Sequence, residues 1–157
     1  MSTTTPATQV LKKASIDFEL VEYDYDPDAD RVGLQAAEAI GAAPSEVFKT
    51  LMIELDRKPV CAVVPSDCEV NMKKLAKAMG GKSAQMMRPT DAERMTGYKV
   101  GGISPLGQRR AIKTALDDSA LGLKKIYING GRRGYQIHIT PQDLIGYLGC
   151  EVADLTR

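Results

Sequence analysis

Hydrophobic and polar residues alternate most regularly in EVFKTLMIELDRKPVCAVVP, residues 46–65. Two apolar runs with the period of a β-strand, VFKTLMIEL and PVCAVVP, are separated by the polar residues 56–58. Branched and aromatic residues favour strands, and a short polar break between two such runs favours a tight turn. The pattern therefore predicts a β-hairpin in this part of the chain.

Helix signals recur in five other segments. Thr, Asn and Pro stand where a helix begins, and Gly stands where it ends, which is typical of helix caps. The predicted helices are TPATQVLKKA (5–14), LQAAEAIGA (34–42), NMKKLAKAMGG (71–81), PTDAERMTG (89–97) and TPQDLIGYLG (140–149). In the third of them Met72, Leu75, Ala76 and Met79 have helical spacing, which predicts that they belong to the core.

Further strands are predicted in the second half of the chain. The runs are RAIKTALDD (110–118), KKIYING (124–130), YQIHIT (135–140) and CEVADL (150–155). No internal repeat and no linker composition interrupts the 157 residues. A strand-rich middle with helices on the flanks predicts one α+β domain, residues 1–157, with a mixed β-sheet.

Composition narrows the class of protein. A chain with 43% hydrophobic and 26% charged residues fits a globular domain that buries one core. Cys61, Cys68 and Cys150 form no CxxC pair, so neither a disulfide framework nor a zinc site is expected. No segment has the apolar core of a signal peptide or the roughly 20 apolar residues of a membrane span. We therefore expect a cytoplasmic protein without a membrane partner.

Charge is divided along the chain although the formal net charge is only +1. Residues 19–46 contain eight acidic residues and one basic residue, whereas residues 99–133 contain eight basic and two acidic residues. A second basic group comprises Lys73, Lys74, Lys77 and Lys82. The blocks are either solvated faces or a surface that binds a polyanion, and sequence alone leaves both open.

Lys49 is the least expected residue of the predicted hairpin. In a strand it shares a face with Val47, Leu51, Ile53 and Leu55, so a charge lies on the more apolar side. It is either an edge-strand lysine whose amine reaches solvent or a partly buried lysine that holds an anion or a polarised carbonyl. The second interpretation makes it a candidate ligand-binding residue.

Two glycine-rich loops complete the unusual features. TGYKVGGISPLGQ (96–108) contains Gly101 and Gly102, which permit a positive φ and a close approach of backbone N–H groups to an oxygen. NGGRRG (129–134) lies between two predicted strands. Neither loop matches GxxxxGK[ST] or GxGxxG, so no nucleotide triphosphate or dinucleotide site is indicated. By itself, each loop is also explained by a tight turn.

Taken together, VFKTL, GYKVGGISPLGQRR and INGGRRG, in this order, resemble the YbaK family of aminoacyl-tRNA deacylases. That family includes the editing domain of bacterial prolyl-tRNA synthetases, and the resemblance runs from about Pro6 to the C-terminus. It implies a barrel-like mixed sheet flanked by helices. It also implies a trans-editing hydrolase that acts on mischarged tRNA(Pro), best matched by the deacylases of Cys-tRNA(Pro). The implied partners are aminoacyl-tRNA and prolyl-tRNA synthetase, with no DNA, metal or cofactor.

The resemblance also assigns residues. It implies catalytic roles for Lys49, Gly101 and Gly102. It implies a substrate pocket lined by Tyr23, Thr50, Tyr98, Ile103, Ser104, Asn129, Gly131 and Gln136. Gln136 stands where relatives commonly have an acidic residue, which leaves the preferred amino acid open. His138 shares its strand face with Gln136, and we favour an ordinary strand role for it.

The chemistry that the residues offer is compatible with ester hydrolysis. An aminoacyl ester is already activated, so an enzyme mainly has to position it and stabilise the developing oxyanion. The sequence has no GxSxG, no HExxH and no Cys beside a His base, so water or a group of the substrate is the expected attacker. Lys49 is expected to hold a phosphate or the acyl group. The alternatives are a noncatalytic module that binds tRNA or a small ligand, and a deacylase that prefers Ala-tRNA(Pro).

Overall fold

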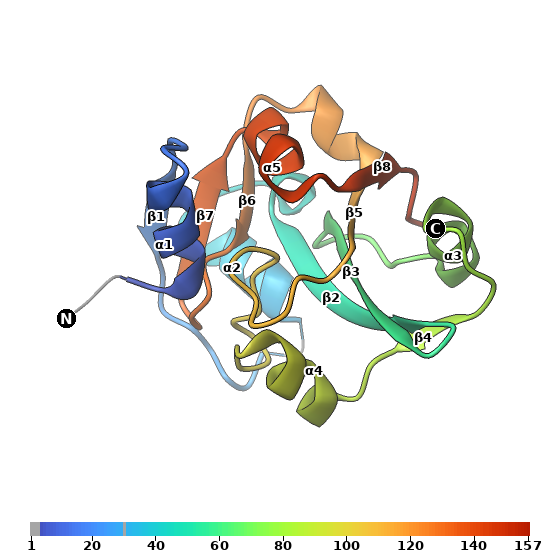
Figure 1. Ribbon diagram of the computed structural model, residues 1–157. Coiled ribbons are helices and arrows are strands. Elements are labelled where there is room, and N and C mark those ends of the chain that lie inside the picture. The colour runs from blue at the N-terminus through green and yellow to red at the C-terminus, as the bar shows by residue number, and fades with distance from the viewer. Residues whose placement is uncertain (1–3, 30) are drawn as a thin grey trace.

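The computed structural model describes residues 4–29 and 31–157 and has an α+β fold (Figure 1). The strands are β1 (Glu19–Glu22), β2 (Phe48–Leu55), β3 (Lys58–Pro65), β4 (Ala84–Met86), β5 (Thr114–Asp117), β6 (Ile126–Asn129), β7 (Tyr135–Ile139) and β8 (Glu151–Ala153). The helices are α1 (Pro6–Lys13), α2 (Val32–Ile40), α3 (Met72–Ala78), α4 (Pro89–Thr96) and α5 (Pro141–Leu148). Short 3-10 turns are η1 (Pro44–Glu46) and η2 (Asp118–Gly122). None of the described helices is long and apolar enough to cross a membrane.

The strands form two sheets. One has the order β1-β7-β6 and is antiparallel, and the other has the order β4-β2-β3-β5-β8, with parallel pairs at β3–β5 and β5–β8. A single parallel bridge between Val47 and Tyr127 links the start of β2 to β6. The described sheets do not close, so the expected barrel-like core is corrected to two sheets that meet at one corner.

The predicted hairpin is confirmed. β2 and β3 pair along their whole length, from Phe48 opposite Pro65 to Leu55 opposite Lys58. The turn consists of Asp56 and Arg57, both with positive φ, as a two-residue hairpin turn requires. Because Lys58 already belongs to β3, the turn is one residue shorter than the polar break in the sequence.

All five predicted helices are present, and their caps explain where they begin and end. The side chains of Thr5, Asn71 and Thr140 accept backbone N–H groups in the first turn of α1, α3 and α5. Gly41 and Gly97 end α2 and α4 in the left-handed conformation. In contrast, β1 and β4 were not predicted, and the strand expected from residue 110 begins only at Thr114.

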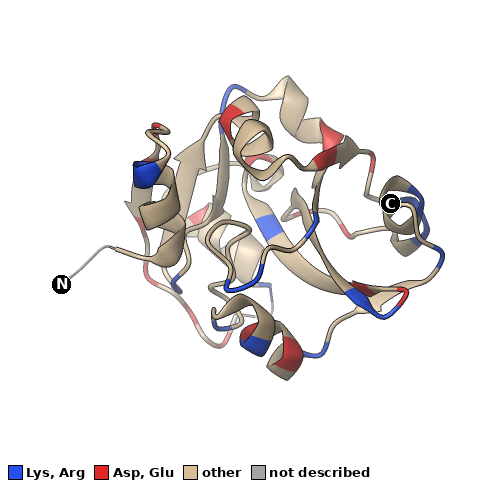
Figure 2. Cartoon of the chain, viewed as in Figure 1, with Lys and Arg blue, Asp and Glu red and all other residues tan. Residues whose placement is uncertain are grey.

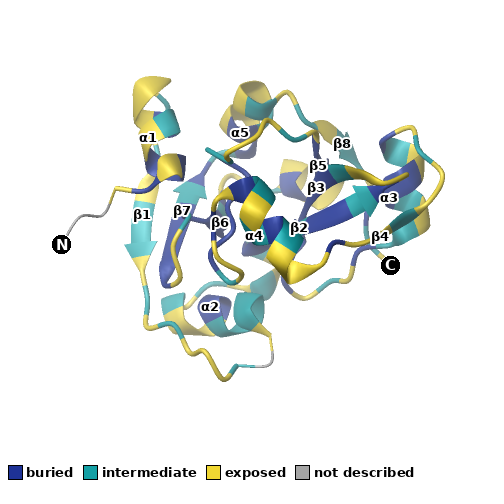
Figure 3. Cartoon of the chain, turned by 60° about the horizontal axis from the view of Figure 1, so that its bottom comes forward, coloured by how far each residue is buried: buried dark blue, intermediate teal, exposed yellow. Residues whose placement is uncertain are grey.

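The five-stranded sheet has a hydrophobic cluster on each face. Its central strand β3 is mostly buried (Figure 3). Phe48 and Met52 of β2 belong to the larger cluster, which the three-stranded sheet and α1 also contact. Ile53 and Leu55 point the other way, into the smaller cluster under α3. The predicted core positions of α3 are confirmed there, with Met72 partly buried at its border.

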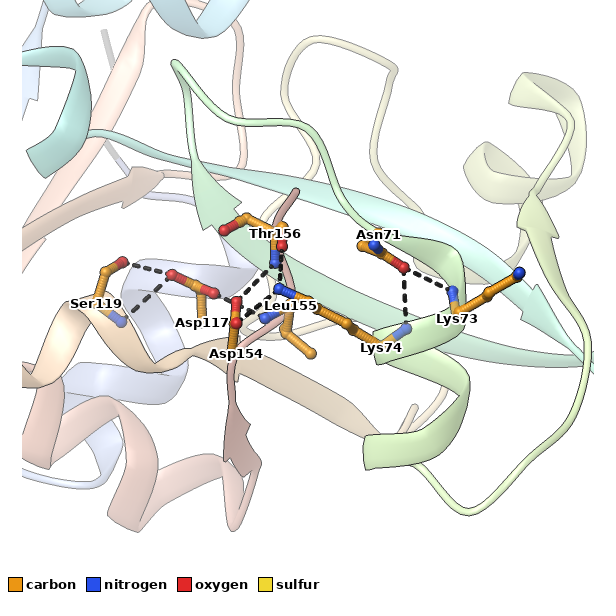
Figure 4. A network of polar contacts seen from close by, with 8 residues as sticks. All are labelled: Asn71, Lys73, Lys74, Asp117, Ser119, Asp154, Leu155 and Thr156. Carbon is orange, nitrogen blue, oxygen red and sulfur yellow. Dashed lines mark hydrogen bonds and ion pairs between the residues drawn. The ribbon is translucent and has the colours of Figure 1, made fainter.

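A polar network fixes the last residues of the chain beside α3 (Figure 4). The buried Asp117 accepts the Leu155 N–H at 2.9 Å through Oδ1 and the Ser119 hydroxyl at 2.5 Å through Oδ2. Lys74 Nζ donates to Asp154 and to the Thr156 carbonyl, each at 2.7 Å. The network holds Leu155 in the smaller cluster, and it occupies the ammonium group of Lys74.

Asp117→Ala is expected to lower the free energy of unfolding by about 2–4 kcal/mol, because it leaves a buried N–H without a partner. Asp154→Ala removes an exposed ion pair and should cost less than about 1 kcal/mol. Chemical denaturation of both variants measures the difference. Equal losses would mean that Asp117 contributes no more than a surface carboxylate.

Candidate active site

A cavity of about 230 Å³ lies beside β2 at the corner where the two sheets meet; we call it the main cavity. The Val47–Tyr127 bridge is the last pairing between β2 and β6 in the described chain, and beyond it the strands separate. Six of the eleven predicted site residues line the space: Lys49, Thr50, Gly101, Ile103, Asn129 and Gln136. Residues that are far apart in the sequence therefore meet at one point.

The exposed edge of β2 supplies polar backbone groups to this corner. β4 pairs only with residues 53–55 of β2, so the preceding half of the strand has no neighbour on that side apart from the bridge. The Met52 carbonyl accepts the Met87 N–H on the same edge. Since backbone groups of alternate residues point the same way in an antiparallel strand, the N–H and C=O of Thr50 also point to this edge.

Asn129 connects the two glycine loops. It lies opposite Gln136 in the β6–β7 ladder. Its Nδ2 donates to the Gly101 carbonyl at 2.9 Å, and its Oδ1 accepts the Gly131 N–H at 3.0 Å. The amide that we expected to bind substrate thus holds both loops in place at the cavity wall.

Three buried side-chain oxygens near this corner have no hydrogen-bond partner within the described residues: Tyr23 OH, Thr50 Oγ1 and Gln136 Oε1. Each was predicted to line a substrate pocket. Burial raises the pKa of Tyr23, although the neighbouring Gln136 and Gly134 partly oppose the shift. Tyr23 and Gln136 are thus close, but their side chains do not reach hydrogen-bond geometry. Unpaired buried polar atoms are costly, and three of them together are typical of a site that a ligand completes.

Lys49 is half-buried at the cavity wall, on the strand face predicted for it. Its ammonium makes no hydrogen bond or ion pair within the described parts of the chain. Burial lowers its pKa, and Arg31 lowers it further, whereas Glu69, Cys68 and Asp67 act in the opposite direction. A cation in these surroundings is stabilised by an anionic or strongly polar ligand.

The glycine loop that starts at the end of α4 divides between two cavities. Gly101 lines the main cavity with φ +92°, and a Cβ there would lie 2.6 Å from the Tyr25 hydroxyl, so only glycine fits. The Gly102 N–H already donates to the Lys99 carbonyl at 2.8 Å. The Gly102 N–H is therefore already used within the loop, so Gly101 is the better-placed candidate donor, and the catalytic roles expected for both glycines stay predictions.

The remaining predicted residues lie outside the main cavity. Tyr98, Gly102 and Gly131 line a second cavity of about 260 Å³, together with Lys99, Arg132 and Arg133; we call it the basic cavity. The Tyr98 hydroxyl donates to the Leu106 carbonyl at 2.6 Å. Ser104 is fully buried, accepts the Leu106 N–H at 3.2 Å and lines neither cavity. Tyr98 and Ser104 therefore stabilise the loop.

Sequence reasoning missed the contribution of α2. Val32 and Gly33 line the main cavity, and a Cβ on Gly33 would lie 2.7 Å from the Ser66 hydroxyl. No motif marks this helix, because its role depends only on close packing against the end of β3. His138 stacks on Tyr127 at 4.0 Å outside both cavities, in agreement with an ordinary strand role.

Neither cavity is lined by a Cys, His, Asp or Glu of the described chain, so neither offers the usual protein ligands of a metal. Among the described residues, one cluster of three carboxylates is compact enough to hold a metal ion. It consists of Asp117, Asp118 and Asp154. Its buried member, Asp117, already accepts hydrogen bonds from Leu155 and Ser119.

Comparison of the sequence with known proteins identifies the family of this chain. The model of the aminoacyl-tRNA editing domain matches residues 26–147. A protein of Enterococcus faecalis, EbsC, is 32% identical over 97% of this chain and 93% of its own length, and is provisionally named as a Cys-tRNA(Pro)/Cys-tRNA(Cys) deacylase. A proline–tRNA ligase of Acidithiobacillus ferrooxidans is 30% identical over 72% of this chain, which corresponds to only 21% of the ligase.

The fold agrees with this relationship. A crystal structure provisionally described as a trans-editing enzyme for prolyl-tRNA synthetase superposes with a TM-score of 0.84 at 25% identity, covering 99% of each chain. The family match spans the main cavity from α2 to the strand that carries Gln136. The chain belongs to the aminoacyl-tRNA editing domain family.

Proposed function

We propose that the protein is a cytoplasmic trans-editing deacylase that hydrolyses the ester between a wrongly attached amino acid and tRNA(Pro), with Cys-tRNA(Pro) as its preferred substrate. The whole chain, residues 1–157, acts as one editing domain in this proposal. The observation that carries it is the main cavity, which is lined by the partly buried Lys49 and by Thr50 and Gln136, two residues whose buried side-chain oxygens have no hydrogen-bond partner within the described residues.

The size of the main cavity supports a small acyl group. Pockets that enclose drug-sized ligands are roughly 300–1,000 Å³. At about 230 Å³ the main cavity is smaller, so it suits one aminoacyl group rather than a whole nucleotide. The names of EbsC and of the structural relative support an aminoacyl-tRNA substrate.

The residues divide the work of ester hydrolysis in a specific way. Lys49 holds the acyl carbonyl or the phosphate of the terminal nucleotide, and the Gly101 N–H stabilises the ester oxygen. Thr50 and Gln136 offer oxygens that can accept hydrogen bonds from the α-ammonium group. Water or the substrate thiol attacks the acyl carbon, since the cavity wall carries no activated protein nucleophile. The bond between the acyl carbon and the ribose oxygen breaks, and the proton of the attacking group passes to the ribose oxygen. The acyl group leaves as the free amino acid after attack by water, or as a thiolactone after attack by the thiol, and free tRNA is released. The neighbouring ribose hydroxyl can only accept the acyl group in a migration, after which water must still complete the hydrolysis.

Prolyl-tRNA synthetase is the partner that this proposal implies. Several proline–tRNA ligases carry a segment similar to this chain, which matches about a fifth of the Acidithiobacillus enzyme. A small pocket cannot recognise the anticodon or the acceptor stem of a tRNA. The synthetase, which binds tRNA(Pro), supplies that selection in our proposal.

The direct test uses Cys-tRNA(Pro), Ala-tRNA(Pro) and Pro-tRNA(Pro) with acid-precipitable charge followed over time. We expect fast loss of cysteine, slower loss of alanine and no loss of proline above the uncatalysed rate. Faster loss of alanine than of cysteine would identify Ala-tRNA(Pro) as the preferred substrate. No loss from any of the three would favour a noncatalytic binding module.

Lys49→Met is expected to lower single-turnover deacylation by about 100-fold or more, because it removes the ligand-facing charge. Lys58→Met, at an exposed lysine of the same hairpin, is the control and should keep the wild-type rate. A wild-type rate in Lys49→Met would remove this lysine from the mechanism. Lys49→Arg should also be slow, since a planar guanidinium does not replace an ammonium.

Lys49→Met should not destabilise the fold. Because burial lowers the pKa of Lys49 from the ordinary value of 10.5, its positive charge opposes folding at pH values below the folded pKa. This penalty disappears as pH rises through the folded pKa. We expect Lys49→Met to melt at or above the wild-type temperature at pH 7, with a smaller difference at pH 10. A lower melting temperature at pH 7 would contradict the direction of the pKa shift.

Gln136→Glu is expected to change the ratio of rates on Cys-tRNA(Pro) and Ala-tRNA(Pro) by at least about threefold, since it adds a charge beside the acyl group. Gln136→Met keeps the side-chain volume without a charge and should change the ratio little. Single-turnover rates separate the chemical step from product release. An unchanged ratio in Gln136→Glu would show that this side chain does not contact the amino acid.

A further inference from the structure

Arg133 supports one wall of the main cavity from the side of the basic cavity. Its Nε donates to the Val100 carbonyl at 2.9 Å, and Val100 and Gly101 line the main cavity. Basic residues are spread over several elements, among them α3, α4 and the β2–β3 turn (Figure 2), so positive charge alone does not distinguish Arg133. The feature that sets it apart is its hydrogen bond to a backbone group of the cavity wall.

This hydrogen bond fixes the direction of the Gly101 N–H. The peptide bond between Val100 and Gly101 is trans, so its C=O and its N–H point in opposite directions. The C=O points to Arg133, which lines the basic cavity, so the N–H points to the other side, where the main cavity lies. The Gly101 N–H makes no hydrogen bond within the described residues, so it can receive an oxygen in the main cavity.

The peptide groups on both sides of Gly101 are held in place. Gly101 has a φ of +92°, and glycine exchanges positive for negative φ at little cost. Asn129 Nδ2 holds the peptide that follows Gly101, and Arg133 holds the peptide that precedes it. Arg133 is itself restricted, because its guanidinium lies over the Tyr25 ring with 5.4 Å from Cζ to the ring centroid. The direction of the Gly101 N–H is therefore set before any ligand binds.

The strand wall of the main cavity offers a second N–H group. Met52 lies opposite Cys61 in the β2–β3 ladder, and the Cys61 N–H donates to the Lys113 carbonyl, away from β2. Pairs that are two residues apart in a ladder are of the same kind, so the backbone groups of Thr50 also point away from β3. No strand of the described chain pairs with Thr50 on that edge, and Thr50 lines the main cavity.

Resting on the proposed function, we propose that the N–H groups of Gly101 and Thr50 form a two-donor site for the oxyanion of the acyl ester, and that Arg133 is the positioning residue that directs the first donor. The carbonyl oxygen gains negative charge when the acyl carbon is attacked, and it loses this charge when the bond to the ribose oxygen breaks. N–H groups that already point to this oxygen stabilise the charge without rearrangement. They lower the barrier more than they strengthen substrate binding.

Two nonhydrolysable ligands distinguish the oxyanion from the uncharged carbonyl. Adenosine 3′-(1-amino-2-mercaptoethyl)phosphonate carries charged oxygens where the oxyanion forms, whereas 3′-deoxy-3′-cysteinylamido-adenosine carries a neutral carbonyl. Arg133→Met should weaken binding of the phosphonate about 10-fold or more, and binding of the amide less than about twofold. Lys99→Met is the control for charge, because Lys99 lines the basic cavity with the same charge. It should weaken phosphonate binding less than about threefold. Equal effects of Arg133→Met on both ligands would overturn the proposal.

Hydrolysis of 3′-cysteinyl-adenosine tests the same residue without contacts to the rest of the tRNA. In single-turnover measurements, Arg133→Met should lower the rate at saturation about 10- to 100-fold and leave the half-saturating concentration within about twofold. Lys99→Met should keep the wild-type rate. A change confined to the half-saturating concentration would mean that Arg133 supports binding and not the chemical step, which contradicts the proposal.

Amide proton shifts test both donors in the wild-type protein, so this measurement does not depend on the folding of a variant. In ¹⁵N-labelled protein, saturation with the phosphonate should move the Gly101 and Thr50 amide protons downfield, because both then donate to a charged oxygen. In Arg133→Met the Gly101 shift should be lost and the Thr50 shift retained. Unmoved Gly101 and Thr50 protons in wild type with the phosphonate bound would overturn the two-donor site.

The experiments separate the failure of each proposal. A protein that hydrolyses no aminoacyl ester, but binds the phosphonate through both N–H groups and loses that affinity in Arg133→Met, would keep the two-donor site and refute the deacylase function. A protein that deacylates its substrate while Arg133→Met matches Lys99→Met in rate and in affinity would keep the function and refute the role of Arg133.

Discussion

The amide of Asn129 is the interaction on which the site depends. Its two hydrogen bonds fix Gly101 and Gly131 relative to β6, and so relative to the Val47–Tyr127 bridge that joins the sheets. Arg133 Nε adds a second link between the loops by donating to the Val100 carbonyl, and these bonds together oppose the conformational entropy of two glycine-rich segments. The Asn129 amide thus contributes to the walls of the main cavity and of the basic cavity together.

The corner between the sheets also explains why polar atoms can remain unpaired in a folded protein. Strands that separate expose backbone groups and leave buried side-chain oxygens without a hydrogen-bond partner, as for Thr50 and Gln136. The cost is offset by the hairpin, whose two faces each bury a hydrophobic cluster. Stability and binding capacity therefore reside in the same strand, with Phe48 and Ile53 in the core and Lys49 at the cavity.

Signals from neighbouring residues in the sequence predicted the local secondary structure. Caps such as Thr5 and Asn71, and the alternation around Lys49, were sufficient for the helices and the hairpin. β1 was missed because a four-residue edge strand rich in acids has no strong period, and its pairing with β7 is decided by tertiary contacts. The sequence motifs identified the two glycine loops that line the cavities. The division of Gly101 and Gly102 between two cavities depends on a turn that the spacing of residues does not reveal. The open arrangement of the sheets was likewise invisible in the sequence.

The size of the main cavity limits what it can discriminate. One methylene more or less in an apolar pocket changes transition-state binding by only about 1–3 kcal/mol, so size alone separates cysteine from alanine or proline poorly. A neutral Gln136 adds hydrogen bonds but no charge to that selection. Discrimination must therefore combine the acyl pocket with contacts to the nucleic acid, which position the ester before its amino acid is tested. Because Val100 and Gly101 line the main cavity at the surface of the molecule's glycine loop, contacts of the nucleic acid with this segment would set the depth at which the ester enters the main cavity. Specificity then depends on geometry at the wall as much as on the volume behind it.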